Sequence, residues 1–171
     1  MLVVARPARR EYAKRYRRSV IVAVKPDGSF AARPAPILIS TLRVVALQDH
    51  SRTHLAEASL GRVGVRARII GLRVSAHGGA SLTDPTATAR VLPAIPGLSL
   101  AWIARLGSTE RAICAPADRP VTDLRGRIRA TCHTTEVPRV VRFAIRFTPE
   151  TETAGTLLAT TSRWVEPVRQ R

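Results

Sequence analysis

Two segments, RIRATCHT (residues 127–134) and VRFAIRF (residues 141–147), decide the fold, because apolar and polar positions alternate in both with a period of two. The apolar positions that share a face are Ile128, Ala130 and Cys132 in the first segment, and Val141, Phe143, Ile145 and Phe147 in the second. Such alternation is expected of β-strands that bury one face. Residues 155–165 are rich in Thr, Leu, Trp and Val, which suit a pleated, half-buried surface. We therefore expect residues 139–165 to form a long hairpin that closes the fold.

The composition favours one domain made of many short strands. The chain has 171 residues, and its hydrophobic fraction of 45% is enough to fill a core. Aromatic residues are only 4%, so Val, Leu, Ile and Ala must build that core. The 12 prolines and 10 glycines indicate frequent turns between elements. An all-β protein is therefore expected.

Further strands are expected at residues 19–24, 37–47, 63–75, 98–106 and 111–115. In the strand at 63–75 the apolar phase slips at Ile69-Ile70-Gly71, which predicts a β-bulge. Residues 49–60 are predicted to form one short helix, and residues 77–88 a polar loop. The prediction is thus an antiparallel sandwich of about eight strands over residues 19–171.

Positive charge is the strongest global property of the sequence. The chain has 28 basic and 12 acidic residues, a formal net charge of +16, and all the basic residues except Lys14 and Lys25 are arginines. Such an excess destabilises a compact chain by self-repulsion unless a polyanion neutralises it, and nucleic acid is the commonest candidate. Arginine binds phosphate bidentately, although a GC-rich coding sequence also enriches arginine. The net charge therefore predicts a nucleic-acid partner.

Residues 1–18 are predicted to form a basic N-terminal arm outside the sandwich. Seven cations stand there against the single acid Glu11: Arg6, Arg9, Arg10, Lys14, Arg15, Arg17 and Arg18. We expect these cations to neutralise phosphates. Tyr12 and Tyr16 would share one face of a helix, where they would stack on bases or dock the arm on the domain. A solvated basic tail and an organelle-targeting presequence are the alternatives.

A second set of arginines alternates with apolar residues on the predicted strands. Arg66 and Arg68 belong to the strand at 63–75, whereas Arg142 and Arg146 belong to the segment at 141–147. If the arm does not bind nucleic acid, these four arginines are the next candidates.

The sequence offers no constellation that predicts catalysis, so no enzyme activity, cofactor or metal is expected. His50, His54 and Glu57 would share a face of the predicted helix, but a catalytic zinc helix usually places a glutamate next to its first histidine. Asp118 and Asp123 bracket a loop, where two carboxylates alone do not define a calcium site.

Cys114 and Cys132 are the only cysteines. Without a signal peptide, two thiols are more simply interpreted as small buried apolar side chains than as a disulfide, so a reducing compartment is expected. No stretch approaches the roughly 18 apolar residues that would span a bilayer. We therefore expect a soluble protein with no membrane partner.

Three parts of the sequence carry a resemblance: the arm RPARREYAKRYRR (residues 6–18), the bent strand VGVRARIIGLRV (residues 63–74) and the end VVRFAIRFTPETETAGTLLATTSRWVEP (residues 140–167). Together they resemble the coat proteins of small icosahedral single-stranded RNA viruses and their satellites. The resemblance is one of pattern and covers nearly the whole chain. It implies a capsid protein with an eight-stranded jelly-roll-like sandwich. It also implies assembly with copies of itself in the host cytoplasm, and a virion in which the arm packages RNA.

A ribosomal RNA-binding protein, in particular a mitochondrial one, is the alternative. Arginines on the arm and on the strand faces would also hold structured RNA. The two functions differ in self-assembly, because a coat buries large surfaces against its own copies, whereas a ribosomal protein buries its surface against RNA and neighbouring proteins.

Overall fold

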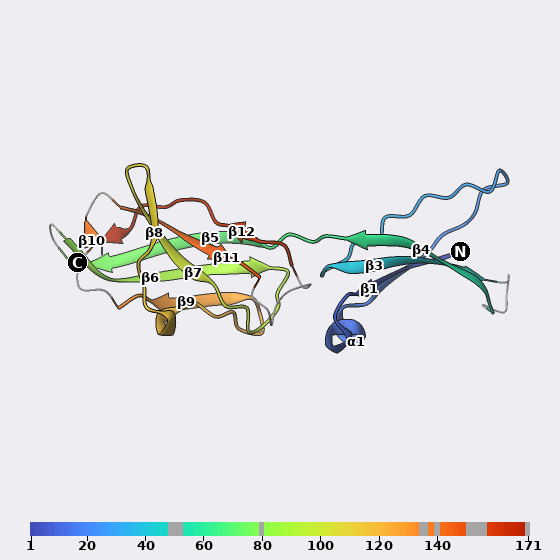
Figure 1. Cartoon of the computed structure of the whole chain (residues 1–171), viewed down its shortest axis with the longest axis horizontal. Helices are drawn as coiled ribbons and strands as arrows, with labels where there is room; N and C mark the ends of the chain where they lie inside the picture. The colour runs from blue at the N-terminus through green and yellow to red at the C-terminus, as the bar shows by residue number, and fades with distance from the viewer. Residues whose placement is uncertain (48–52, 79–80, 134–136, 139–140, 150–156, 170–171) are drawn as a thin grey trace. The chain divides into compact units, whose positions relative to one another are not determined.

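The structure, a computed structural model, describes residues 1–47, 53–78, 81–133, 137–138, 141–149 and 157–169. The chain divides into two compact units. Unit 1 comprises residues 1–65 and 151–158, and unit 2 comprises residues 66–150 and 159–171. The described residues contain mostly strands and one short α-helix (Figure 1). The prediction of a mostly β protein with antiparallel sheets and one short helix is confirmed at this level.

Unit 1 is built on a four-stranded antiparallel sheet with the order β2-β1-β3-β4. Its strands are β1 (Leu2–Pro7), β2 (Arg18–Ile21), β3 (Ser40–Leu47) and β4 (His54–Val63). β1 lies between β2 and β3, and its residues Val3, Val4 and Ala5 are all buried. A strand covered on both faces shows a continuous apolar run instead of alternation. The sequence pattern therefore does not reveal β1.

A short helical segment connects β1 to β2. The 3₁₀-helix η1 (Arg10–Tyr12) leads into the α-helix α1 (Ala13–Tyr16), whose buried residue is Tyr16. The rings of Tyr12 and Tyr16 meet edge to face, with their centroids 5.8 Å apart. The predicted shared face of the two tyrosines is therefore present.

One sheet of unit 2 has five strands, with β6 (Ser81–Leu92) in its centre. Along one edge, β6 pairs with β5 (Arg68–His77). Along the other edge it pairs with β9 (Arg127–Thr131) and with the short β10 (Val137–Pro138). β13 (Val168–Arg169) runs parallel to the end of β5, whereas all the other pairs are antiparallel.

The second sheet of unit 2 has the order β12-β11-β7-β8. Its strands are β7 (Ala101–Leu106), β8 (Thr109–Ala112), β11 (Arg142–Phe147) and β12 (Thr160–Thr161). The alternating residues Trp102, Ala104, Phe143, Ile145 and Phe147 are at most 3% exposed. Ile128 of β9 and Cys132, the residue that follows β9, are buried as well. The alternation predicted for residues 127–134 and 141–147 is thus confirmed where the structure describes it.

Unit 2 holds two sheets, and aromatic rings of the second sheet contribute to its core. Trp102 on β7 is buried, and its ring meets that of Phe143 on β11 edge to face. The predicted single sandwich of eight strands differs from this arrangement, because β1 to β4 form a sheet of their own.

Cys114 and Cys132 form a disulfide, so the expectation of two free thiols is wrong. Cys114 follows β8 and Cys132 follows β9, and the bond therefore joins the two sheets of unit 2. The sandwich brings the two Cα atoms to 5.4 Å, within the range that a disulfide spans. Two cysteines and the lack of a recognisable signal peptide favoured free thiols, but this proximity arises only in the folded chain.

The helix predicted at residues 49–60 is wrong where the structure describes it. Residues 49–52 lie outside the described residues, and His54–Val63 is β4. β4 pairs with β3 along most of its length, and this pairing outweighs the helix propensity of its alanines. Gly61 has φ +95° next to a register shift of the β3–β4 ladder.

Two further predictions in the first half of unit 2 have opposite outcomes. Residues 77–88 were expected to form a loop, but β6 begins at Ser81, and its threonines suit a strand because they are β-branched. The predicted bulge is confirmed: the β5–β6 register shifts between Ile70 and Arg73, and Gly71 has φ +63°.

The division of the chain also differs from the predicted arm and domain. Residues 1–18, expected to lie outside the core, contain β1 and the helical segment of unit 1. The boundary predicted at residue 18 falls at the start of β2, inside that sheet. The arginines of this segment obscured a short strand whose residues Val3, Val4 and Ala5 are buried.

Reduction of the disulfide should lower the free energy of unfolding of unit 2 by about 3 kcal/mol, as expected for a closed loop of this size. The two cysteines are 18 residues apart. Trp102 and Trp164 both lie in unit 2, so their fluorescence during urea denaturation reports on that unit. The double variant Cys114→Ser/Cys132→Ser should be equally destabilised and insensitive to reductant. Equal urea midpoints for oxidised and reduced wild type would contradict this prediction.

Candidate nucleic-acid interface

Unit 1 carries an open groove of about 480 Å³ lined by several cations, which we call the unit 1 groove. Val4 and Arg6 of β1 are two residues apart and so point to the same side of the sheet, and Arg43 of β3 lies opposite Val4. Lys14 of α1 and Arg17 just after it complete the cationic lining. Four cations from three segments of unit 1 thus meet in one place.

Among the described residues, one carboxylate lines the unit 1 groove. Glu57 of β4 accepts a hydrogen bond from Nη1 of Arg43 at 2.6 Å. The ion pairs found in the described part of the chain do not involve Arg6, Lys14 or Arg17, and these three side chains are exposed. The groove therefore keeps three uncompensated cations, which attract phosphate.

The other cations predicted in residues 1–18 do not line this groove. Nη2 of Arg9 pairs with Oε1 of Glu11 at 2.8 Å. Arg10 and Arg18 are exposed and lie outside the lining. The basic residues of the sequence indicated the right segment of the chain, but the fold places only some of these cations in the unit 1 groove.

Tyr16 and Arg15 pack against each other at the end of α1. Tyr16 is 7% exposed, and the guanidinium of Arg15 lies 5.5 Å from its ring centroid. The hydroxyl of Tyr16 is buried and has no hydrogen-bond partner in the described part of the chain. A ring this buried leaves little surface for a base. The structure therefore favours docking of the tyrosines on unit 1 over base stacking.

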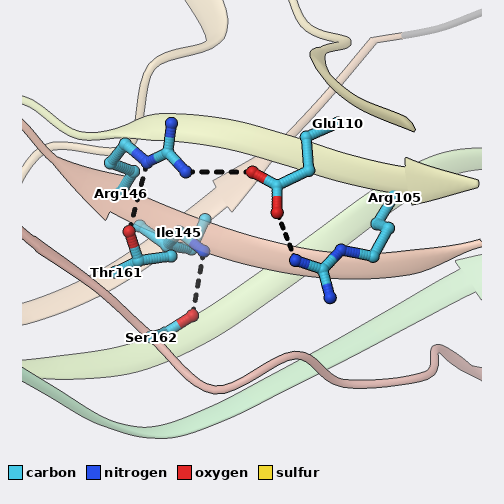
Figure 2. A network of polar contacts seen from close by, with 6 residues as sticks. All are labelled: Arg105, Glu110, Ile145, Arg146, Thr161 and Ser162. Atoms are coloured by element: carbon cyan, nitrogen blue, oxygen red, sulfur yellow. Dashed lines mark hydrogen bonds and ion pairs between the residues drawn. The ribbon is translucent and has the colours of Figure 1, made fainter. Parts of the chain in front are cut away.

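The strand arginine Arg146 belongs to a network on the outer face of the second sheet, which Figure 2 shows. Glu110 of β8 accepts hydrogen bonds from Arg105 of β7 and from Nη2 of Arg146, the latter at 3.1 Å. Nε of Arg146 donates to Oγ1 of Thr161 at 3.1 Å. The hydrogen bond from Arg105 and that from Arg146 hold the pKa of the Glu110 carboxyl below its usual value. Arg146 is thus engaged with an ionised carboxylate.

Arg142 has an acidic partner as well. Its Nη2 lies 3.2 Å from Oε1 of Glu166, and its Nε donates to the same oxygen at 3.3 Å. The guanidinium of Arg105 lies over the ring of Trp164, 4.2 Å from the centroid. This face therefore combines its arginines with two glutamates and a tryptophan, and little of its positive charge remains for phosphates.

Arg66 and Arg68 lie in a different place from Arg142 and Arg146. They line an open groove of about 520 Å³ in unit 2 together with Arg163, and all three side chains are exposed. The structure thus separates the four secondary candidates into two pairs.

Arg43 is the cation of the unit 1 groove that the sequence analysis missed. It is an isolated arginine in an apolar stretch, and only its pairing with β1 places it beside Arg6. No local sequence signal distinguishes it from other arginines on strands.

Acidic and metal-binding residues add no second site. The described residues contain no group of three His, Cys, Asp or Glu side chains that could hold a metal ion. Nε2 of His54 lies 3.8 Å from Oε2 of Glu57, and His50 lies outside the described residues. Oδ2 of Asp118 accepts the backbone N–H of His133 at 3.0 Å. This carboxylate therefore links its loop to the segment that follows β9.

Comparisons with protein-family models, with curated proteins and with solved structures find no match for this chain. In the part of the chain that the structure describes, no helix is long and apolar enough to cross a membrane. The distribution of charge is therefore the main observation on which a function can be proposed.

Tyr16→Phe should leave the protein at least as stable as the wild type, because it removes a buried hydroxyl without a partner and keeps the ring. We expect the free energy of unfolding to rise by no more than about 1 kcal/mol. Tyr16→Ala should instead lose about 3–5 kcal/mol, as for other large buried rings. Urea denaturation followed by far-UV circular dichroism measures both changes. A clear loss of stability in Tyr16→Phe would show that the hydroxyl is bonded in solution.

Proposed function

We propose that the protein is a structural protein that binds single-stranded RNA and packages it in a shell made of its own copies. The observation that carries RNA binding is the unit 1 groove, where Arg6, Lys14 and Arg17 have no carboxylate partner among the residues that the structure describes. The rest of its described lining is apolar apart from the paired Arg43 and Glu57. Such a surface binds phosphates and has little means of reading bases.

Exposed sheet edges support self-assembly. β4 is an edge strand of unit 1, and almost its whole length is exposed, with Leu55 62% and Leu60 56% exposed. β2 forms the opposite edge, where Ile21 is 64% exposed. Unpaired strand edges with apolar side chains favour pairing with another chain. Assembly through such edges does not require a jelly-roll order of the strands.

The disulfide favours a shell over a ribosomal protein. Cys114 and Cys132 are joined, and disulfides persist in oxidising places such as the surface of a virion but are rare in reducing compartments. In the proposed sequence of events, subunits assemble around RNA in the host cytoplasm. In the released virion, an external oxidant such as dioxygen would then take two electrons and two protons from the thiols of Cys114 and Cys132 and so close the disulfide. A ribosomal protein would share the RNA-binding groove but would not assemble with itself.

Removing Arg6, Lys14 and Arg17 should weaken RNA binding and its salt dependence. In the triple variant Arg6→Ala/Lys14→Ala/Arg17→Ala, the slope of log affinity against log salt should flatten by about 2 units, since each phosphate contact on a single strand contributes about 0.7. Fluorescence polarisation with labelled oligouridylate over a series of salt concentrations measures this slope.

The matched control is Arg9→Ala/Arg10→Ala/Arg18→Ala, which removes the same charge from the same segment but outside the groove lining. We expect its slope to change by less than half as much. Equal flattening in both triple variants would show that total charge, and not the groove, binds RNA.

Lysines on the β4 edge should prevent assembly. Leu55→Lys/Leu60→Lys places charge along an exposed strand without disturbing the core, and edge lysines oppose strand pairing. Light scattering after size-exclusion chromatography, together with electron microscopy, should show particles for the wild type with RNA and small species for the variant. The control Leu106→Lys/Leu124→Lys alters two other exposed leucines and should still assemble. A wild-type protein that stays monomeric at high concentration with RNA would overturn the proposal that the protein forms a shell.

A further inference from the structure

Four arginines gather on the outer face of the β5-β6-β9 sheet of unit 2. They are Arg73 on β5, Arg90 on β6, and Arg127 and Arg129 on β9, and all four are exposed. Thr88 pairs with Arg73 on one side and with Arg129 on the other, while Arg90 pairs directly with Arg127. Cross-strand partners point to the same side of a sheet. We call this surface the arginine face.

The register determines the spacing of the four side chains. Neighbouring strands lie about 4.8 Å apart, and residues i and i+2 of one strand about 6.8 Å apart. Arg73 and Arg129, on either side of Thr88, are therefore separated by about 10 Å, and Arg127 and Arg129 by about 7 Å at their Cα atoms. Four flexible guanidinium groups anchored on such a patch can contact successive charges of an extended anion.

Almost nothing in the described residues neutralises the arginine face. The ion pairs of unit 2 arginines lie on the other sheet and use Glu110 and Glu166. The one acid in the lining is Asp123, whose Oδ1 accepts the backbone N–H groups of Arg127 at 2.8 Å and Arg125 at 2.7 Å. The first of these hydrogen bonds contributes most to lowering the pKa of Asp123. Four cations thus share one carboxylate.

The arginine face also offers room and apolar surface. Its residues line an open groove of about 860 Å³, together with Ile70 and Val121, which are 38% and 55% exposed. Phosphates would bind the arginines, and bases would pack on the apolar side chains and on the guanidinium planes. A flexible single strand of nucleic acid, with charged phosphates on one side and flat bases on the other, fits this combination.

We propose that the arginine face is a second RNA-binding surface, which holds a single strand by its phosphates. The choice of RNA as the ligand rests on the function proposed above. The surface itself lies in the other unit and uses other residues. Because Arg90 stands directly opposite Arg127, their repulsion destabilises the sheet when no anion is bound. Bound RNA should therefore both use these cations and stabilise unit 2.

The test compares two double variants of the full chain. Arg127→Ala/Arg129→Ala removes two cations of the arginine face, and Arg142→Ala/Arg146→Ala removes two cations that are paired with glutamates on the other sheet. We expect the first variant to flatten the salt slope for oligouridylate by about 1.4 units, at about 0.7 per contact, and the second by less than half as much. Circular dichroism checks that each variant is folded. The double variant Arg73→Gln/Arg90→Gln tests a second pair of arginines on the arginine face.

A second measurement reports on unit 2 alone. Because both tryptophans lie there, thermal unfolding followed by their fluorescence should shift to higher temperature when oligouridylate is added to the wild type. The shift should be smaller in both variants of the arginine face and unchanged in the control pair. Equal shifts in all variants would overturn the proposal.

The outcomes separate the two surfaces. If the groove triple variant loses salt dependence and the arginine-face variants do not, the second surface is overturned while RNA binding by unit 1 stands. The opposite result would assign RNA to unit 2 and overturn the function proposed for the unit 1 groove. Binding of heparin with the same affinity as oligouridylate, and with competition between them, would replace RNA by sulfated polysaccharide as the ligand and overturn the assignment to RNA.

Discussion

Mutual repulsion among arginines is the constraint on which the surface of this protein depends. The net charge is +16, and like charges placed opposite each other destabilise a sheet. On one outer face of unit 2, Glu110 and Glu166 offset the neighbouring arginines. In the described part of the chain, Arg6, Lys14 and Arg17 in unit 1 and the arginines of the arginine face have no such ion pair, and these cations line open grooves. The placement of a few acids therefore decides which arginines support the fold and which are free to bind an anion.

The interior of unit 2 tolerates this charged surface because its stability does not come from ion pairs. Exposed pairs contribute little in water, whereas Trp102, Phe143 and Phe147 bury large apolar rings between the strands of a core otherwise built from aliphatic residues. The Cys114–Cys132 bond adds a covalent link between the sheets. Arginines on the outer faces can thus be replaced without loss of the core. Mutations can therefore change the surface charge without changing the packing of the core.

The sequence predicted strands where one face alone is buried, as in β9 and β11, because alternation is then visible locally. The sequence did not predict strands whose structure depends on the neighbouring strands they pack or pair with. β1 is buried on both faces, and β4 resembles a helix until it is paired with β3. The bulge at Gly71 was predictable because a phase slip and a glycine coincide in the sequence. The disulfide was not, since it depends on the distance between Cys114 and Cys132 in the folded sandwich.

The candidate sites follow the same division between local and long-range information. The cations of residues 1–18 are evident from the sequence alone. Arg43, in contrast, lines the unit 1 groove with three of them only because β3 pairs with β1 in this register. Likewise, the arginine face draws on three strands that are separated in sequence, and alternation by itself does not say which arginines will share a face. If both surfaces bind RNA as proposed, each would raise the effective concentration of RNA at the other, and the gain would multiply when subunits repeat in the proposed shell. Weak, salt-sensitive contacts in each subunit would then be sufficient to hold RNA in the proposed particle, and a rise in ionic strength would release it cooperatively.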